Sequence, residues 1–386
     1  RKVQAREFYE AAYFTAREEE EILTSVSFAT SVCGYAYEKQ KRKIGDYATA
    51  AAGVLVTIDN GTCSSASIAL TNLADTPIYC EAATAVLVGS SLDAAAIDAA
   101  VKAARKAYTN TWSKMSGKER GKYLYRIARI MQERAREFAV LETLDNGKPI
   151  RESRDTDIPL AAAHFFYHAG WADKLEYAGL GTSPKPLGVA GQIIPWNFPL
   201  LMLAWKVAPA LAAGNTVVLK PSELTPATAH LLAEVLDKHL PKGVFNMVQG
   251  AGDVGAALSA SKVDAISFTG SVPTGKKIAL AAIKNMARVQ CEMGSKNPIV
   301  ITKNADIDLA VAQSVHGAFG ASGQKCTASS RLIVEDTIHD EFVEKFVKAS
   351  ELKKVGHALA EGTELGPVVS EGQMNKILSY MDLAKS

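Results

Sequence analysis

The stretch GVAGQIIPWNFPLLMLAWKVAPALAAGNTVVLKPSE, residues 188–223, decides the fold of this chain. A short apolar run is followed by a longer segment rich in Ala and Leu and then by a second apolar run. The same alternation continues through VFNMVQG (244–250) to AISFTGS (265–271). Strands that alternate with helices in this way favour a parallel sheet with crossover helices on both faces. We therefore expect an α/β fold whose ligands bind at the carboxyl ends of the strands.

Length and composition set the outer bounds. The chain has 386 residues, of which 48% are hydrophobic, so it can bury the cores of two or three domains. The formal net charge of +2 provides no strong field for a nucleic acid or an anionic membrane. No uninterrupted apolar run reaches the roughly 20 residues that span a bilayer. We expect neither nucleic acid nor membrane as a partner.

The cysteines indicate a reducing compartment. There are five of them, an odd number without a C-x-x-C pair, which argues against a disulfide framework or a structural zinc site. His164 and His168 have helical i, i+4 spacing, but no Glu lies between them as in zinc proteases, so we expect no metal there. We predict a cytoplasmic protein.

The first hundred residues follow a different pattern. VLVTI (54–58) and TCSSASIALTNL (62–73) flank Asn60-Gly61, which predicts a hairpin because both turn residues must take positive φ. From about residue 94 an Ala-rich helical pattern begins. This change from period 2 to period 3.6 predicts a junction near residues 90–107. A small α+β domain with antiparallel strands should therefore precede the larger one.

Cys326 and Glu292 are the candidate catalytic pair. A thiolate can add to a carbonyl, and a carboxylate can later take a proton from water. A lone Cys is most often a small buried hydrophobe, but polar neighbours and Lys325 favour a thiolate here. Glu292 follows the apolar run MARVQC, so we expect it to be partly buried and able to accept a proton near neutrality. Cys291 should point to the other face of the strand and be structural.

Two loops suggest a dinucleotide. In FTGSVPTG (268–275) a strand runs into a helix whose first amides can face a pyrophosphate. The spacing misses the usual glycine fingerprints, so an ordinary strand-to-helix turn is an equal alternative. Lys220 and Glu223 close another strand, and a carboxylate there accepts ribose hydroxyls and repels a 2′-phosphate, favouring NAD over NADP. An incidental charge pair is the alternative.

Asn197 is a candidate oxyanion donor. It lies in PWNFP (195–199), which must leave regular structure because of its two prolines. Such a loop can aim the Asn197 amide at a developing oxyanion. A packing turn with Trp196 and Phe198 in the core is the alternative.

Five ordered motifs resemble the NAD(P)-dependent aldehyde dehydrogenase superfamily: PWNFP, AGNTVVLKPSE, FTGSVPTG, EMGSKNP and GQKCTASSR. The resemblance covers about residues 99–386. It implies a Rossmann-like NAD-binding domain over residues 99–293 and part of a catalytic domain over residues 294–386. Cys326 would add to an aldehyde, with Asn197 and the Cys326 amide holding the oxyanion, and Glu292 would activate the hydrolytic water.

The resemblance implies further roles. Lys206 matches a lysine assigned to proton relay. The residues that would contact the cofactor are Ile194, Pro195, Trp196, Lys220, Ser222, Glu223, Gly270, Ser271, Gly275 and Met293. By the same resemblance, the chain ends before the family's Glu-x-Phe-Gly-Pro segment and before the strand that builds the oligomer. We therefore expect impaired activity, and a homo-oligomer when the chain is complete.

Residues 1 to about 98 are similar to the C-terminal domain of the FAD-binding medium subunit of the carbon monoxide and xanthine dehydrogenase family, through REFYEAAYFTAREEEEILTSVSF and GTCSSASIALTNLADTPIYC. This resemblance implies two alternatives to aldehyde oxidation. The first alternative is an FAD-binding subunit of a molybdenum hydroxylase, and the second is an inactive chimeric fragment. The phosphate-binding glycines of a flavin domain are absent from this segment, so FAD binding is not expected to survive.

Overall fold

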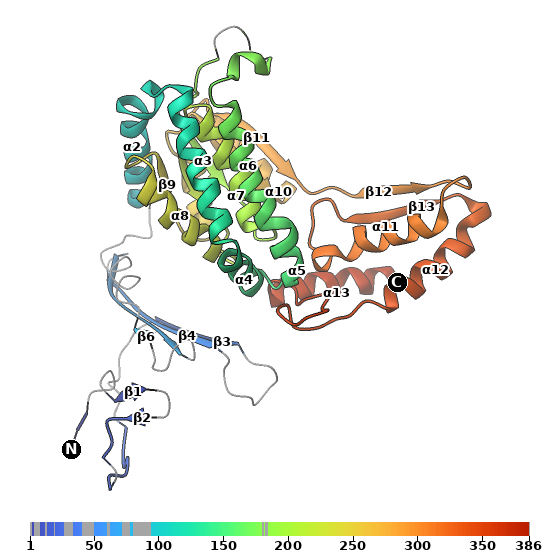
Figure 1. The fold of residues 1–386 in the computed structure, drawn as a ribbon, viewed down its shortest axis with the longest axis horizontal. Coiled ribbons are helices and arrows are strands. Elements are labelled where there is room, and N and C mark those ends of the chain that lie inside the picture. Colours follow the sequence, from blue (N-terminus) through green and yellow to red (C-terminus); the bar gives the residue numbers. More distant parts are fainter. Residues whose placement is uncertain are drawn as a thin grey trace. The chain divides into compact units, whose positions relative to one another are not determined.

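The computed structural model describes residues 2–3, 8–11, 14–18, 20–26, 34–40, 50–59, 62–71, 78–79, 94–179, 181 and 184–385 (Figure 1). The chain divides into two compact units, Arg1–Ala96 and Ile97–Ser386. The division falls in helix α2 (Ala94–Asn110), within the junction expected near residues 90–107.

The first unit contains a four-stranded antiparallel sheet in the order β3 (Gly34–Gln40), β4 (Ala50–Asp59), β5 (Thr62–Thr71) and β6 (Ile78–Tyr79). Two short strands, β1 (Tyr9–Ala11) and β2 (Phe14–Thr15), form a separate pair. Asp59 of β4 pairs with Thr62 of β5, which confirms the strands of the expected hairpin. The turn residues Asn60 and Gly61 lie outside the described residues.

The second unit is built on a five-stranded sheet in the order β11-β10-β7-β8-β9. All neighbouring pairs are parallel, which confirms the expected α/β architecture. Within this sheet the chain first forms the central strand, β7, and then adds β8 and β9 on one side of it. The next two strands, β10 and β11, are added on the opposite side of β7. This reversal puts the topological switch point between β7 and β10, where sheets of this type bind their ligands. The strands are β7 (Val189–Ile193), β8 (Thr216–Lys220), β9 (Phe245–Met247), β10 (Ala265–Gly270) and β11 (Arg288–Met293).

Helices cover both faces of this sheet, and this explains the continuous apolar runs of its strands. All five residues of β8 are buried. Val217 and Leu219 belong to one hydrophobic core, and Val218 belongs to the core on the opposite face. The first core involves α3 (Gly117–Glu133), α4 (Ala135–Asn146), α6 (Ile158–Trp171), α7 (Pro199–Ala212) and α8 (Ala227–His239), and the second involves α2, α9 (Gly252–Ala260) and α10 (Val272–Ile283).

A smaller layer follows the parallel sheet. Strands β12 (Asn297–Ile301) and β13 (Ser329–Val334) pair in parallel. Their core is formed with α11 (Ile307–Phe319) and α12 (His339–Glu351) around Phe342, and α13 (Glu371–Lys385) comes last. The short helical segments of the unit are Trp112–Lys114, α5 (Ile150–Glu152), a π-helix at Ser153–Asp157, Leu175–Ala178, Gly320–Gly323 and Asp336–Ile338.

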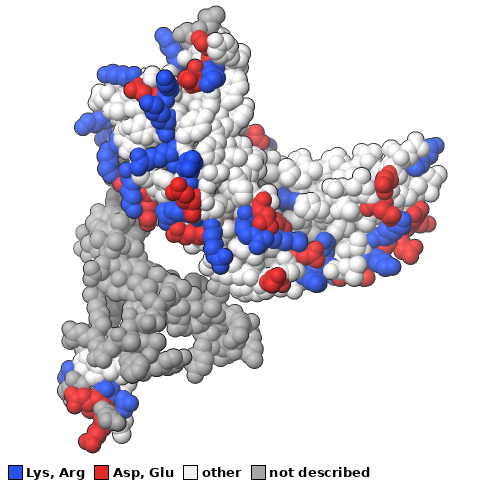
Figure 2. All heavy atoms as spheres, in the orientation of Figure 1, with Lys and Arg blue, Asp and Glu red and all other residues white. Residues whose placement is uncertain are grey.

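Charges of both signs cover the second unit. On the face drawn in Figure 2, Lys and Arg gather over α2 and α3 with Asp and Glu among them, and the two signs mix over α12 and α13. Within the described part of the chain, no helix combines the length and the apolar character needed to cross a membrane.

Candidate active site

Most of the candidate residues lie at one edge of the parallel sheet. Strand β7 leads into the loop Ile194–Phe198, β8 ends at Lys220, β10 ends at Gly270, and β11 ends at Met293. Because parallel strands present their carboxyl ends at the same edge, four segments far apart in the sequence meet there.

Lys220 and Glu223 form an ion pair of 3.0 Å between Nζ and Oε2. The Lys220 side chain is buried, whereas the Glu223 side chain is about half exposed. Ser222, also buried, accepts a hydrogen bond from the Leu224 amide at 3.2 Å. A donor and an acceptor are therefore held at the end of β8, with the carboxylate open to solvent.

The turn after β10 has the expected strand-to-helix geometry. Ser271 caps α10 by accepting a hydrogen bond from the Thr274 amide at 3.4 Å. A Cβ atom on Gly275 would lie 2.6 Å from the Met293 sulfur, and one on Gly270 would lie 2.5 Å from the Phe268 ring. Glycine at these two positions allows the helix to begin close against the ends of β10 and β11, with its free amides at the sheet edge.

Asn197 connects the sheet edge to the loop that carries Cys326. Its Nδ2 atom donates to the Gln324 carbonyl oxygen at 2.9 Å. An amide group has two hydrogens, so one remains available for a ligand. Cys326 is a free, exposed thiol, and Lys325 donates to the His316 carbonyl at 3.3 Å.

The residues that precede Cys326 in the chain have an unusual backbone conformation. Ala321 and Ser322 have φ of 53° and 54°, and Gly323 has φ of 73°. Positive φ in consecutive residues other than Gly is strained, and such strain concentrates at functional sites. Tertiary contacts hold it, because the Ala321 amide donates to Glu152 Oε1 at 2.9 Å and the Ser322 hydroxyl donates to the Gly366 carbonyl at 3.0 Å.

Glu292 lies on the edge strand β11, opposite Thr269 of β10. Its side chain is exposed, so the expectation that it is partly buried is wrong. An apolar run predicts burial only where neighbours cover the strand, and most of β11 is exposed. Cys291 is half-buried and packs against the core, as expected, and burial raises the pKa of its thiol against the opposing effect of Lys206.

Lys206 extends from α7 toward the same strand. It is buried, and its Nζ atom donates to the Ser267 hydroxyl at 2.9 Å. Burial lowers the pKa of Lys206 to about 8, although the nearby charges of Glu292 and Cys291 act in the opposite direction. Ser267 donates to Gln290 Oε1, and Gln290 Nε2 lies 3.5 Å from Glu292 Oε1. Among the described residues these hydrogen bonds connect Glu292 to Lys206, but none connects Glu292 to the Cys326 loop.

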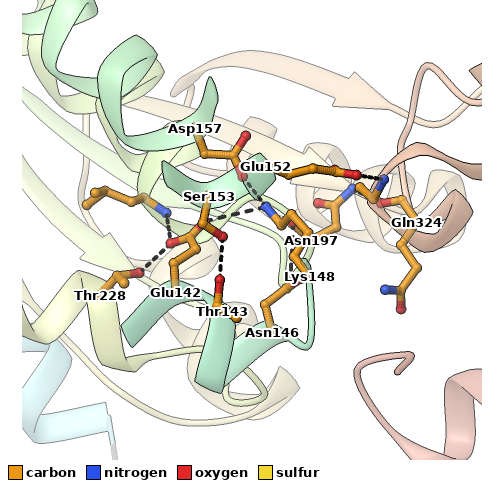
Figure 3. Close-up of polar contacts among 12 residues, drawn as sticks. Glu142, Thr143, Asn146, Lys148, Glu152, Ser153, Asp157, Asn197, Thr228 and Gln324 are labelled. Atoms are coloured by element: carbon orange, nitrogen blue, oxygen red, sulfur yellow. Dashed lines mark hydrogen bonds and ion pairs between the residues drawn. The ribbon is translucent and has the colours of Figure 1, made fainter. Parts of the chain in front are cut away.

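A buried polar group next to Asn197 was not predicted (Figure 3). Lys148 lies between two carboxylates, Glu142 and Asp157, and all three are almost completely buried. Asn146 and Glu152 lie in the same stretch of chain, between Glu142 and Asp157. Asn146 bonds to the Trp196 carbonyl, and Glu152 bonds to the Ala321 amide. The sequence signal was the polar stretch LDNGKP (144–149) at the end of an amphipathic helix, which alone is indistinguishable from a solvated helix end.

A doubly wound α/β protein with a thiol-bearing loop tied to the carboxyl edge of its sheet is the class that this fold and site define. Within that class, the chain belongs to the aldehyde dehydrogenase family, whose model matches residues 77–386. The match begins inside the segment expected to be unrelated, since the resemblance to this family was expected only from about residue 99.

Known relatives agree with this membership. The chain is 44% identical over 298 residues to betaine aldehyde dehydrogenase of Bacillus subtilis, covering 74% of this chain and 60% of that protein. It is 47% identical over 303 residues to aldehyde dehydrogenase family 2 member B4, a mitochondrial protein of Arabidopsis thaliana, covering 75% of this chain and 56% of that protein.

A solved structure has the same fold. The structure of betaine aldehyde dehydrogenase from Staphylococcus aureus in complex with NAD⁺ matches with a TM-score of 0.71 at 39% identity, covering 75% of this chain and 60% of that chain. The present chain thus spans 60% or less of the length of each of these three proteins.

Proposed function

We propose that this chain oxidises an aldehyde to a carboxylic acid with NAD, through a thioester on Cys326. The observation that carries the proposal is the hydrogen bond between the Asn197 side chain and the Gln324 carbonyl. It holds the Asn197 amide, which follows strand β7, next to the loop in which Cys326 carries an exposed thiol two residues after Gln324. Family membership and relatives such as betaine aldehyde dehydrogenase support the same reaction.

The residues of the chain suit each step. The Cys326 thiolate forms a bond to the aldehyde carbon, and the carbonyl oxygen becomes an oxyanion. The second amide hydrogen of Asn197 and the backbone N–H of Cys326 stabilise that charge. NAD, when bound, supplies the acceptor for the hydride that leaves the carbon. Glu292 then takes a proton from the water that attacks the thioester, releasing the acid and regenerating the Cys326 thiolate.

NAD fits the residues at the sheet edge. The close approach of α10 to β11 at Gly275 leaves the first amides of the helix beside the switch point, which suits a pyrophosphate. Lys220 and Glu223 provide a donor and an acceptor for a ribose, and the exposed carboxylate disfavours the extra phosphate of NADP. We place the cofactor against the segments already described, with these neighbours: Ile194, Pro195, Trp196, Lys220, Ser222, Glu223, Gly270, Ser271, Gly275 and Met293.

Lys206 has a supporting role in this proposal. An ammonium whose pKa is about 8 exchanges protons near neutrality. Ser267 and Gln290 would hold the two groups in register across α7, β10 and β11. Residues 99–293 would form the cofactor-binding domain and residues 294–386 part of the catalytic domain.

Other assignments remain predictions. The relatives are aldehyde dehydrogenases and do not support an FAD-binding subunit or a chimeric chain. For residues 1–76, which the family model does not reach, the flavoprotein resemblance is still a prediction. The cytoplasmic location and the homo-oligomer are predictions as well.

The two described free cysteines provide a matched test. Cys326→Ala should abolish the aldehyde-dependent rise in NADH absorbance, because it removes the sulfur that would form the thioester. Cys291→Ala removes a half-buried thiol of the same strand that carries Glu292 and should retain most of the activity. Aliphatic, aromatic and ω-carboxy aldehydes would be compared in the same assay. NADH formation that persists in Cys326→Ala, or is absent from the unmodified chain, would overturn the proposal.

A further inference from the structure

The Glu142, Lys148 and Asp157 side chains form a buried ionic cluster next to the loop that carries Asn197 (Figure 3). The Lys148 ammonium is bonded to Asp157 Oδ2 and lies 3.5 Å from Glu142 Oε1. Burial raises the pKa of Glu142 to about 7, although Lys148 acts in the opposite direction. Buried charges are costly unless they are paired, so the cluster holds its surroundings in a defined arrangement.

The cluster supports the end of the loop that leads into α7. The Lys148 ammonium lies 4.1 Å from the centroid of the Phe198 ring, a cation–π contact that is strong where water is excluded. Glu142 Oε2 accepts hydrogen bonds from the Thr228 hydroxyl at 3.0 Å and from the Leu200 amide at 3.4 Å, in the first turn of α7. A carboxylate at this helix end also complements the helix dipole.

Two side chains hold the peptide group just before Asn197. Asn146 Nδ2 donates to the Trp196 carbonyl oxygen at 2.6 Å, and the Thr225 hydroxyl donates to the same oxygen at 3.0 Å. Asn146 comes from the end of α4 and Thr225 from the segment after β8, so the carbonyl is held from two sides. The Asn197 side chain, one residue on, reaches the Gln324 carbonyl.

We propose that Asn146 and Thr225 are positioning residues for Asn197: by holding the Trp196 carbonyl, they fix the amide that faces the Cys326 loop. Neither residue needs to touch the substrate. The inference rests on the proposed role of Asn197 as the oxyanion donor. Errors of position at a reacting centre are costly in rate, so a loosened donor should lower kcat more than it weakens cofactor binding.

Asn146→Ala is the main test, because the Trp196 carbonyl keeps its bond from Thr225 while the 3.4 Å hydrogen bond from Asn146 Nδ2 to the Asn197 carbonyl is also lost. We expect kcat to fall about tenfold with little change in the KM for NAD. In the Asn197→Ala background the same change should lower kcat by less than about twofold, since residues that act through one another are not additive. Thr143→Val is the matched control: it removes a buried hydrogen bond to Ser153 one turn earlier and none of the hydrogen bonds described above for the Ile194–Phe198 loop.

A second readout does not need activity. Hydrogen exchange of the loop amides of Trp196, Asn197 and Phe198 should become about tenfold faster in Asn146→Ala and stay unchanged in Thr143→Val. Thr225→Val tests the other donor in the same way and replaces Asn146→Ala if that variant does not melt cooperatively. Unchanged exchange, or a kcat loss of equal size in the Asn197→Ala background, would overturn the inference. If the unmodified chain forms no NADH, the proposed function fails, and the exchange comparison still decides the positioning claim.

Discussion

The two halves of the candidate site are built differently. Asn197 is fixed on both sides, because its side chain bonds to Gln324 and the preceding carbonyl accepts from Asn146 and Thr225. Glu292 is exposed on an edge strand, and Gln290, its hydrogen-bond neighbour, is at 3.5 Å. An oxyanion donor works by being in place before charge develops, whereas a base that activates water must meet water. The fixed half suits the first requirement and the open half the second.

Removing the fixed donor should have the largest effect. Asn197→Ala should lower kcat by about 10²- to 10³-fold, because one oxyanion donor is lost, with little effect on the KM for NAD. Steady-state kinetics at saturating NAD would measure it. Asn285→Ala, which removes an amide bonded to the Ala260 carbonyl far from these loops in the sequence, is the control. A fall in kcat of less than about threefold would contradict the assignment of Asn197.

Neutralising the open base should slow turnover and spare the first step. Glu292→Gln should lower kcat by about 10²-fold, because hydrolysis of the thioester loses its base. A rapid burst of NADH should remain, since addition and hydride loss do not need this carboxylate. Stopped-flow absorbance separates the two phases. Loss of the burst together with turnover would place Glu292 in the first step instead.

The smallest expected effect is that of Lys206 on how the stability of the protein depends on pH. The folded pKa of Lys206 is about 8, below its ordinary value of 10.5, so the unfolded chain binds more protons between these values and stability rises with pH. From pH 7 to pH 9 this one group should contribute an increase in the free energy of unfolding of about 1 kcal/mol. Lys206→Met should lack that increase, which is measured by comparing urea titrations at pH 7 and at pH 9. If the free energy of unfolding rises equally with pH in Lys206→Met and in the unmodified chain, Lys206 is not desolvated in solution.

Sequence patterns predicted the parallel sheet and the loops of Asn197 and Cys326, because strand–helix alternation and paired prolines are local signals. They did not predict that Ser267 faces Gln290, because that depends on the register between strands of different crossover units. The cluster around Lys148 was missed for a related reason: a helix pattern does not reveal which of its polar ends a neighbouring loop will cover. The expected burial of Glu292 failed because β11 is an edge strand.

The left-handed residues Ala321 and Ser322 have a consequence for how the protein fails. Their conformation is unfavourable by itself and persists through contacts with Glu152 and Gly366, which lie far away in the sequence. Such a segment relaxes when those distant contacts loosen, well before a five-stranded sheet melts. Mild denaturant should therefore abolish the proposed activity while the circular dichroism is still that of the native protein, so that inactivation and unfolding become two separate events.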